Sequence, residues 1–291
     1  MTQEHASFDP DRPDQGIDPR FTFDFRTYDR LGDGQRWSTW LSVEPLCRGP
    51  EPRPDWVVTS QGAVDTELGI LKTGKEADAF LLDRTDPHDP AQSAVMVAKR
   101  YRDDRHRSFH RAATYTEGRS TKRSRDERAL KRRSTWGREV AKSEWAASEW
   151  NALVRCWQLG LSVPYPVQID GTELLMEWIE ADGETAPRLA QTRPDAGLLA
   201  SYFDQVRSAM LTLAEAGLAH GDLSPYNILA AGERLVIIDL PQVVDLAGNA
   251  AGPDFLHRDC VNVCTWFRQR GLDPAVADEE ALFGELMAAA W

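Results

Sequence analysis

The 291-residue sequence contains no run of about 18 apolar residues, so we expect no transmembrane helix and no membrane partner. Its beginning, MTQEHASFDPDRPDQG, is polar and acidic and lacks the apolar core of a signal peptide. These two absences favour a cytoplasmic protein. Hydrophobic residues at 42% and charged residues at 27% are ordinary for a globular protein that folds in water.

Cysteine is scarce. The four cysteines form no CxxC pair, and none has a histidine partner at zinc-ligand spacing. Cys260 and Cys264 lie four residues apart and would share one face of a helix. We predict buried, reduced thiols rather than a metal or redox site at Cys47, Cys156, Cys260 and Cys264.

Acidic residues outnumber basic ones, and the net charge of −12 argues against general affinity for nucleic acids. The charge is uneven, however. Residues 99–142 hold 16 Lys and Arg against 6 Asp and Glu, so this segment carries +10 and the remainder −22. We predict a flexible basic loop over residues 100–138, which either stays solvated or contacts phosphate groups, RNA, a ribosome or the acidic body.

Secondary-structure patterns divide the chain into a strand-rich part and a helical part. The pattern predicts a turn over residues 85–93, a strand over residues 94–101 and another strand over residues 171–179. Apolar periodicity and glycine stops predict helices over residues 137–160, 197–216, 254–271 and 279–291. This segregation predicts an α+β fold with a small β-rich lobe, a helical lobe and a cleft between them.

The predicted boundaries are an N-terminal extension over residues 1–55, an N-lobe over 56–180 and a C-lobe over 181–291. Part of the extension is rich in Pro, Asp and Gly, and we expect its first dozen or so residues to be disordered. Its aromatic clusters, FTFDF and RWSTW, predict that another part docks on the main body or forms a short helix.

The stretch HGDLSPYNIL, from His220, places an acid and an amide beside an aliphatic run, and VIID repeats this arrangement with Asp239. Asp222 has the chemistry to accept or orient the proton of an attacking hydroxyl group. Asn227 and Asp239 carry the oxygen ligands that Mg²⁺ prefers when substrate phosphates complete its shell. The competing interpretation is a β-hairpin with turn-forming Asp and Asn residues, which explains the flanking strands and the spacing less well.

Two further elements fit the same chemistry. Lys99 ends the apolar strand MVAK and would reach nucleotide phosphates if a helical carboxylate held it, and Glu149 is the candidate holder. TGKEADAF contains a turn with one glycine, Gly74, and matches neither GxGxxG nor the Walker pattern. A solvent-facing glutamate and a plain hairpin turn are the alternatives for these two elements.

Taken together, these motifs resemble those of the RIO family of atypical protein kinases. HGDLSPYNIL matches the family's catalytic loop, and IDLPQ resembles its IDxxQ metal motif. LKTGKEADAF resembles its nucleotide loop STGKEAxVY, with Lys72 in place of the first Ser. VAKRY resembles the strand of its ATP-binding Lys, and FLHRDCVNV its FLxxDCxNV signature. The similarity runs from about Asp65 to Gly271, and no winged-helix pattern precedes it.

The resemblance implies a two-lobed, protein-kinase-like fold with an ATP cleft between the lobes, and a role for each matching residue. Lys99 would contact ATP phosphates and pair with Glu149, Asp222 would be the catalytic base, and Ser224 would support its loop. Asp239 would be the principal metal ligand, assisted by Asn227, and would accept a phosphoryl group transiently in some reactions. The nucleotide would contact residues of the turn, the sheet and the hinge, namely Leu71, Thr73, Gly74, Lys75, Val97, Lys99, Met176, Glu177 and Ile179.

We therefore expect a serine/threonine protein kinase that uses ATP with Mg²⁺, or with Mn²⁺ instead, and phosphorylates a protein or itself. Hydroxyl groups for autophosphorylation occur in the basic setting at Ser108, Thr114, Ser120, Thr121, Ser124, Ser134 and Thr135. One alternative is an ATPase switch that remodels a ribosomal or other ribonucleoprotein particle. Another is a small-molecule phosphotransferase of the aminoglycoside or choline kinase type, which also uses an HGD…N loop.

Overall fold

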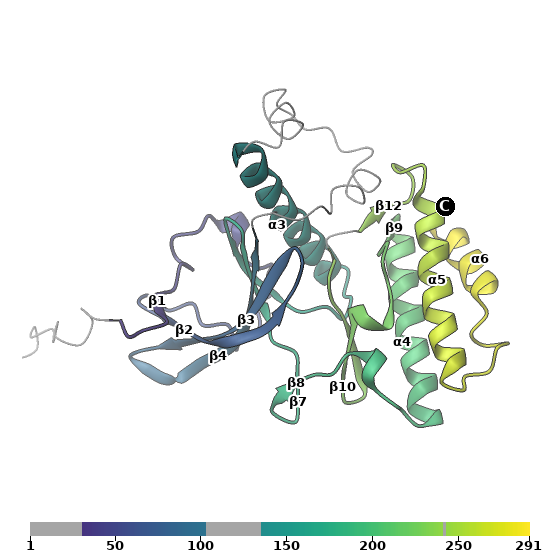
Figure 1. Cartoon of the computed structure of the whole chain (residues 1–291), viewed down its shortest axis with the longest axis horizontal. Coiled ribbons are helices and arrows are strands. Elements are labelled where there is room, and N and C mark those ends of the chain that lie inside the picture. The colour runs from purple at the N-terminus through teal and green to yellow at the C-terminus, as the bar shows by residue number, and fades with distance from the viewer. Residues whose placement is uncertain (1–30, 103–134, 241–242) are drawn as a thin grey trace, which may run out of the picture.

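The computed structural model describes residues 31–102, 135–240 and 243–291 (Figure 1). A β-rich lobe and a helical lobe form the molecule, as the sequence predicts. The start of the predicted extension and most of the predicted basic loop lie outside the described residues. Within those residues, no helix is both long and apolar enough to cross a membrane.

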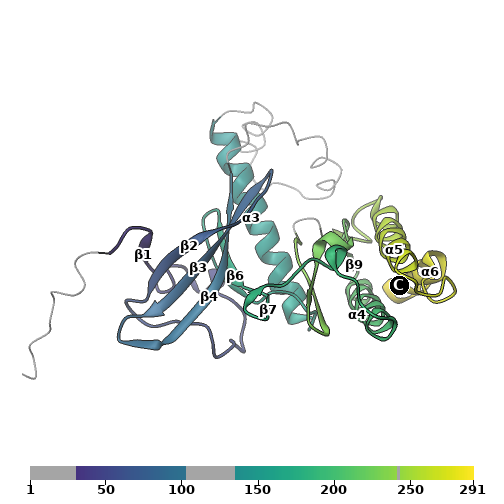
Figure 2. The ribbon, with the colours of Figure 1, turned by 60° about the horizontal axis from the view of Figure 1, so that its bottom comes forward.

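The N-lobe is built on a six-stranded antiparallel sheet with the strand order β1-β2-β3-β4-β6-β5. Its strands are β1 (Gln35–Trp37), β2 (Val64–Thr73), β3 (Ala77–Asp86), β4 (Asp89–Tyr101), β5 (Pro166–Asp170) and β6 (Glu173–Glu177). Helix α3 (Thr135–Gln158) packs against β5 and β6 and runs between the sheet and the helical lobe (Figures 1 and 2).

The hairpin between β3 and β4 differs from the prediction. A turn was expected over residues 85–93, but only Pro87 and His88 separate the two strands. Polar residues such as Asp86, whose Oδ1 accepts from the His88 backbone N–H at 2.8 Å, are typical of turns and gave the pattern. Pairing with the rest of β3 extends the strand through these residues, with a register shift after Thr85.

The two faces of the sheet have different roles. Alternation along β4 directs Met96 and Ala98, both fully buried, to the outer face, and Val97 and Lys99 to the face that meets the cleft. The outer face is covered by residues from the described part of the predicted extension and from β5. Trp40 is buried there, and Trp56 packs edge-on against Tyr165.

The segment before β2 is tied to the sheet by its backbone as well. The Gly49 N–H donates to the Val167 carbonyl at 2.9 Å, and the Tyr165 hydroxyl donates to the Pro50 carbonyl at 3.0 Å. A Cβ on Gly49 would lie 2.0 Å from the Pro166 carbonyl oxygen, so only glycine fits this approach. Residues 35–58 therefore complete the core on the outer face of the N-lobe.

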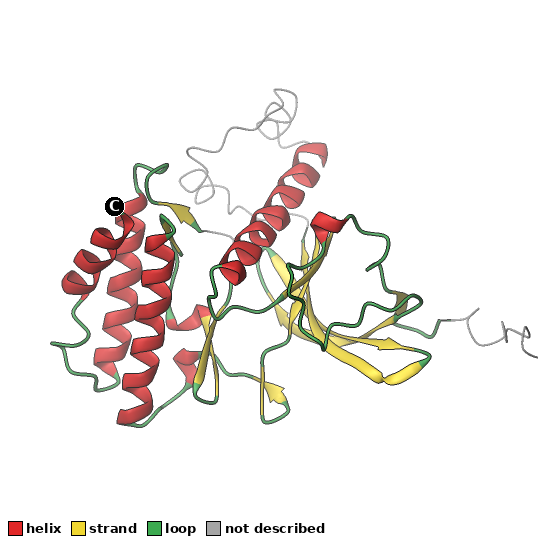
Figure 3. Ribbon diagram, turned by 180° about the vertical axis from the view of Figure 1, so that it is seen from behind, coloured by secondary structure: helices red, strands yellow, loops and turns green. Residues whose placement is uncertain are grey.

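The C-lobe contains three long helices that lie side by side, α4 (Ala196–Glu215), α5 (Gly252–Gln269) and α6 (Glu279–Ala290) (Figure 3). The predicted helices over these regions are confirmed within a few residues at each end. Asp195 caps α4 by accepting the Leu198 N–H at 2.9 Å, and Gly217, at φ +72°, follows its end. Asp278 caps α6 in the same way.

Short elements connect the lobes and shape the cleft. They are the hairpin β7 (Glu180–Ala181) and β8 (Glu184–Thr185), the pair β9 (Leu218–Ala219) and β12 (Val244–Asp245), the hairpin β10 (Ile228–Ala231) and β11 (Arg234–Ile237), and the 3₁₀ helices η4 (Leu189–Gln191) and η5 (Pro225–Asn227). A further 3₁₀ helix, η3 (Pro45–Cys47), lies against β5 in the N-lobe.

The cysteines are free thiols. Cys156, Cys260 and Cys264 are buried, as predicted, whereas Cys47 is only partly buried. Burial raises the pKa of Cys156 to about 12 and that of Cys264 to about 11. Such thiols stay protonated near neutral pH and act as small apolar side chains.

Candidate active site

Lys99 lies at the point where the two lobes meet. Its Nζ atom is 2.6 Å from Glu149 Oε1 of α3 and 2.9 Å from Asp239 Oδ1, which follows β11 in the C-lobe. Burial lowers the pKa of Lys99, but the two carboxylates raise it by more, so the pKa lies above its ordinary value. The ammonium group is therefore a permanent positive charge that joins three elements.

Tyr101 is a residue that the sequence analysis missed. It lies two residues after Lys99 on the same face of β4, and its hydroxyl group donates a short hydrogen bond to Glu149 Oε2. Glu149 is 3% exposed and thus has a partner for each of its carboxylate oxygens. Burial and the Glu149 charge raise the pKa of Tyr101, so the hydroxyl stays a donor. The alternation in VAKRY was a usable signal for this contact.

Asp239 has an unusual backbone conformation, with φ at +65° in the left-handed region. This region is disfavoured for a residue with a side chain, and Asp and Asn tolerate it better than most residues. Burial raises the pKa of its carboxyl group, but the attraction of Lys99 more than offsets this, and the pKa lies below its ordinary value. Asp239 is therefore ionised near neutral pH and has one oxygen that is not bound to Lys99.

The loop after β9 connects Asp222 to the same region. The Asn227 side-chain amide donates to the Asp222 carbonyl at 2.9 Å, and the Asn227 carbonyl accepts the Ile238 N–H at 2.9 Å. Asp222 itself is exposed. Asn227 thus joins the loop to the residue that precedes Asp239, which brings Asp222, Asn227 and Asp239 into one site.

His220 also contacts the segment that leads to Asp239. It is 1% exposed, and its Nε2 atom lies 3.4 Å from the Ile238 carbonyl. Burial lowers the pKa of its imidazole, which favours the neutral form. A neutral ring fits a structural role between the loop and the strand that leads to Asp239.

Side chains of helix α5 bind the backbone of the loop that contains Asp222. Asp259 accepts the Gly221 N–H at 2.8 Å and the Leu223 N–H at 2.7 Å, one on each side of Asp222. Asn262 donates to the Leu223 carbonyl at 3.1 Å. Burial raises the pKa of Asp259 to about 7 even though the two N–H groups oppose this shift. Two polar residues of FLHRDCVNV, Asp259 and Asn262, therefore face the loop, whereas His257 pairs with Glu280 at the surface.

Most of the residues predicted to contact a nucleotide lie in the N-lobe, as Lys99 does. Gly74 begins the turn between β2 and β3, where its N–H donates to the Ala77 carbonyl at 3.0 Å, and a Cβ there would lie 2.6 Å from that oxygen. Val97 pairs with Met176 across β4 and β6 and shares the face of Lys99. Leu71 is partly buried, and Thr73 and Lys75 are exposed.

The stretch after β6 connects the two lobes. The Glu177 N–H already donates to the Tyr165 carbonyl at 2.9 Å, so only its carbonyl remains for a ligand. The Ile179 side chain is buried with Ala186 and Val236, which holds its backbone at the edge of the C-lobe.

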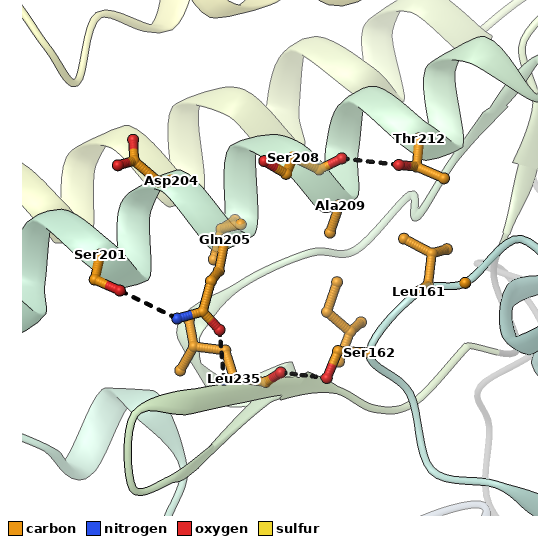
Figure 4. Close-up of a pocket in the computed structure, with 12 residues that line it drawn as sticks. Leu161, Ser162, Ser201, Asp204, Gln205, Ser208, Ala209, Thr212 and Leu235 are labelled. Atoms are coloured by element: carbon orange, nitrogen blue, oxygen red, sulfur yellow. Dashed lines mark hydrogen bonds between the residues drawn. The ribbon is translucent and has the colours of Figure 1, made fainter.

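A separate cavity of about 460 Å³ lies between the loop over residues 160–162, α4 and β11 (Figure 4). None of the predicted site residues lines it. Its polar groups bond to one another, since Ser162 Oγ donates to the Leu235 carbonyl at 2.6 Å and the Leu235 N–H donates to Gln205 Oε1 at 2.9 Å. One acid, Asp204, lines the cavity, but no Lys, Arg or His does, so it offers no cation for phosphate comparable to Lys99.

Comparison with known proteins supports the motif analysis. A family model described as the RIO domain matches residues 93–282, which is more than half of the chain. The chain belongs to the RIO family.

Curated relatives of this RIO-family chain are named serine/threonine-protein kinases. The RIO-type kinase Rio1 of Haloferax volcanii is 33% identical over 226 residues, covering 78% of this chain and 70% of that protein. The kinase RIO1 of Caenorhabditis elegans is 30% identical, covering 70% of this chain, and human RIO3 is 27% identical, covering 77%. The chain spans only 37% and 42% of the length of those two eukaryotic proteins.

Two solved structures are similar to this RIO-family chain. Both are of the Rio2 kinase from Chaetomium thermophilum, and one is a complex with ADP/Mg²⁺ and phosphoaspartate. The TM-scores are 0.49 and 0.48 at 22% and 23% identity, and the matches cover 77% of this chain and 65% and 67% of those chains.

Proposed function

We propose that this RIO-family chain transfers the γ-phosphoryl group of ATP to serine or threonine hydroxyl groups of a protein, including its own. The observation that carries this proposal is the contact of Lys99 with both Glu149 and Asp239, at 2.6 and 2.9 Å. Phosphoryl transfer depends on positioning and charge neutralisation more than on covalent chemistry by the protein, and this contact supplies both.

The donor set fits a magnesium ion. Asn227 and Asp239 would hold it, and no group of three or more His, Cys, Asp or Glu side chains gathers among the described residues to form a protein-only cage. The Asn227 amide nitrogen is bound to the Asp222 carbonyl, which leaves its Oδ1 atom as the available ligand. Mg²⁺ prefers such a sparse set with phosphate and water oxygens, and Mn²⁺ accepts the same ligands. When bound, the ion would neutralise phosphate charge.

Each proposed site residue then has a defined role. Lys99, held by Glu149, would orient the phosphates, and the carbonyl of Glu177 and the N–H of Ile179 would hold the adenine. Asp222 is exposed, so it would face the hydroxyl group of the substrate and accept its proton. Asn227 would keep Asp222 and Asp239 at a constant separation.

The ATPase switch is the second candidate. Only residues 240–251 separate Asp239 from α5, which leaves little chain for a platform that docks an extended peptide. In that case water would attack the γ-phosphoryl group or a phosphorylated Asp239. Contact with a ribosome or RNA through residues 100–138 belongs to this hypothesis.

Asp222→Ala tests the proposal. We expect the variant to bind ATP with nearly wild-type affinity and to lose at least about 100-fold in turnover, because it removes the proton acceptor but no phosphate ligand. Transfer of labelled phosphate is measured with the chain alone, with a generic protein substrate and with ribosomal particles. Retention of most phosphoryl transfer by Asp222→Ala would refute the assignment, and release of free phosphate without protein labelling would favour the ATPase.

A further inference from the structure

Lysine is rare in this chain. It occurs at only six positions, 72, 75, 99, 122, 131 and 142, although the sequence has 34 Lys and Arg. Among the residues whose side chains the structure describes, the lysines are Lys72, Lys75 and Lys99, which belong to β2, the turn after it and β4. Lys75 and Lys99 are already part of the proposed nucleotide site, which leaves Lys72 without an assigned role.

The sheet register places Lys72 on the same face as Lys99. Lys72 pairs with Ala79 across β2 and β3, and Ala79 pairs with Lys99 across β3 and β4. Residues paired directly across antiparallel strands point to the same side of the sheet, and two strand spacings separate the outer members of such a row by about 10 Å. Ala79 lies between the two lysines in this row, and its side chain is small.

The charges around Lys72 are mainly positive. Its ammonium group makes no hydrogen bond and no ion pair with any residue in the described part of the chain, and it is exposed. Burial of part of the side chain lowers the pKa of Lys72, and the positive charges of Arg188 and Lys99 lower it further, whereas Asp239 raises it. Lys72 thus lies near two other cations, Arg188 and Lys99, and an anionic ligand with several charges would relieve their repulsion.

We propose that Lys72 is a second phosphate-binding cation, which contacts the polyphosphate of the nucleotide from the side opposite Lys99. This inference rests on the proposed function. It assigns a role to one position at which the chain departs from the nucleotide loop that it resembles, where a serine is replaced by lysine. A lysine provides a compact charge with three donors, which suits a phosphate oxygen.

The experiment compares nucleotide affinities by fluorescence competition in the presence of Mg²⁺. Lys72→Gln keeps the length and polarity of the side chain but removes the charge. We expect it to bind ADP and ATP about tenfold more weakly and adenosine equally well, because one charge-assisted contact to phosphate is lost. Lys72→Arg should restore most of the affinity, and Lys72→Ser should behave like Lys72→Gln.

Arg207→Gln is the matched control. It removes one positive charge from α4, where Arg207 pairs with Glu285 on the surface of the C-lobe, and should leave all three affinities unchanged. Equal ADP affinity in wild type and Lys72→Gln would overturn the inference, as would an equal loss for ADP and adenosine. Failure of the wild type to bind any adenine nucleotide would instead overturn the proposed function.

Discussion

At the residue scale, Glu149 and Asp239 compete for one ammonium group. Lys99 contacts both, and Asp239 is also the proposed metal ligand. A bound nucleotide would bring phosphate oxygens and a metal ion, so Asp239 would turn to the metal and Lys99 to the phosphates. In this hypothesis the Lys99–Asp239 contact would break when the nucleotide binds, whereas the buried Lys99–Glu149 contact would persist throughout the reaction.

Tyr101→Phe tests whether the hydrogen bond from Tyr101 to Glu149 supports the Lys99–Glu149 pair. The change leaves one oxygen of buried Glu149 without its donor, and hydrogen bonds to charged groups contribute about 1.5–3 kcal/mol. We expect a loss of stability of that order in urea unfolding and a several-fold decrease in turnover, since Glu149 would no longer be held in place.

Tyr202→Phe is the control for this prediction. The Tyr202 hydroxyl donates to the Gly232 carbonyl, a neutral acceptor in the C-lobe. Its removal should cost about 1 kcal/mol of stability without a change in turnover. If both variants lost turnover equally, Tyr101 would have no special part in the site.

Sequence reasoning identified the residues with distinctive chemistry but not their supports. Lys99 and Asp239 were predicted because a lysine after an apolar strand and an acid after an aliphatic run are unusual, and Glu149 was the helical carboxylate expected to hold Lys99. Lys99 is in direct contact with both acids. Tyr101 was missed although alternation along β4 places it on the face of Lys99, whereas the position of Lys72 beside Lys99 depends on strand register. Register is set by pairing between distant segments and is not visible in a single strand.

At the element scale, periodicity predicted the helices well. Helices α4 and α5 carry strong apolar patterns with identifiable ends, and their bounds agree with the prediction within a few residues. The hairpin between β3 and β4 was predicted poorly, because residues such as Asp86 and Pro87 favour turns locally. Cross-strand pairing overrode that local preference.

Asp259→Asn tests α5 as the scaffold of the catalytic loop. Asn offers one acceptor oxygen, and its NH₂ group would face a backbone donor, so one of the bonds to Gly221 and Leu223 would be lost. We expect turnover to fall by about tenfold or more while ADP affinity stays within twofold, since Asp259 supports Asp222 but does not face the nucleotide.

The amide signals of Gly221 and Leu223 in NMR spectra report on the loop itself, because a change in overall stability alone would not shift them. They should shift in Asp259→Asn, and the amide of Leu198 at the start of α4 should not. Unchanged turnover together with shifted loop signals would show that the position of the loop does not limit the reaction.

At the scale of the whole molecule, the N-lobe has a core whose place on the sheet no local pattern predicted. Residues 35–58 cover the outer face of the sheet, with Trp40 at 3% exposure. The sequence RWSTW indicated that part of the segment docks on the main body, but the docking face depends on contacts with β4 and β5, more than a hundred residues away in the case of β5. Long-range packing of this kind cannot be read from composition or periodicity.

The ion pair between Lys99 and Asp239 joins the two lobes and should make their association depend on pH. The Asp239 pKa is held below its ordinary value, so the pair contributes stability above about pH 4, the ordinary range of an Asp carboxyl group, and loses it as pH falls through the lowered pKa. In Lys99→Met the strongest attraction is absent and only weaker ones such as that of Lys72 still oppose burial, so the Asp239 pKa should rise above its wild-type value.

The Asp239 carboxyl carbon, followed by NMR as pH is lowered, should therefore titrate at a higher pH in Lys99→Met than in the wild type. Lys99→Arg keeps the charge and should titrate close to the wild type. The stability advantage of the wild type over Lys99→Met in urea should shrink below about pH 4, because protonation of Asp239 breaks the pair in the wild type alone. Identical Asp239 titrations in the wild type and Lys99→Met would mean that the lobes do not share this charge in solution, and the central contact of the proposed site would be lost.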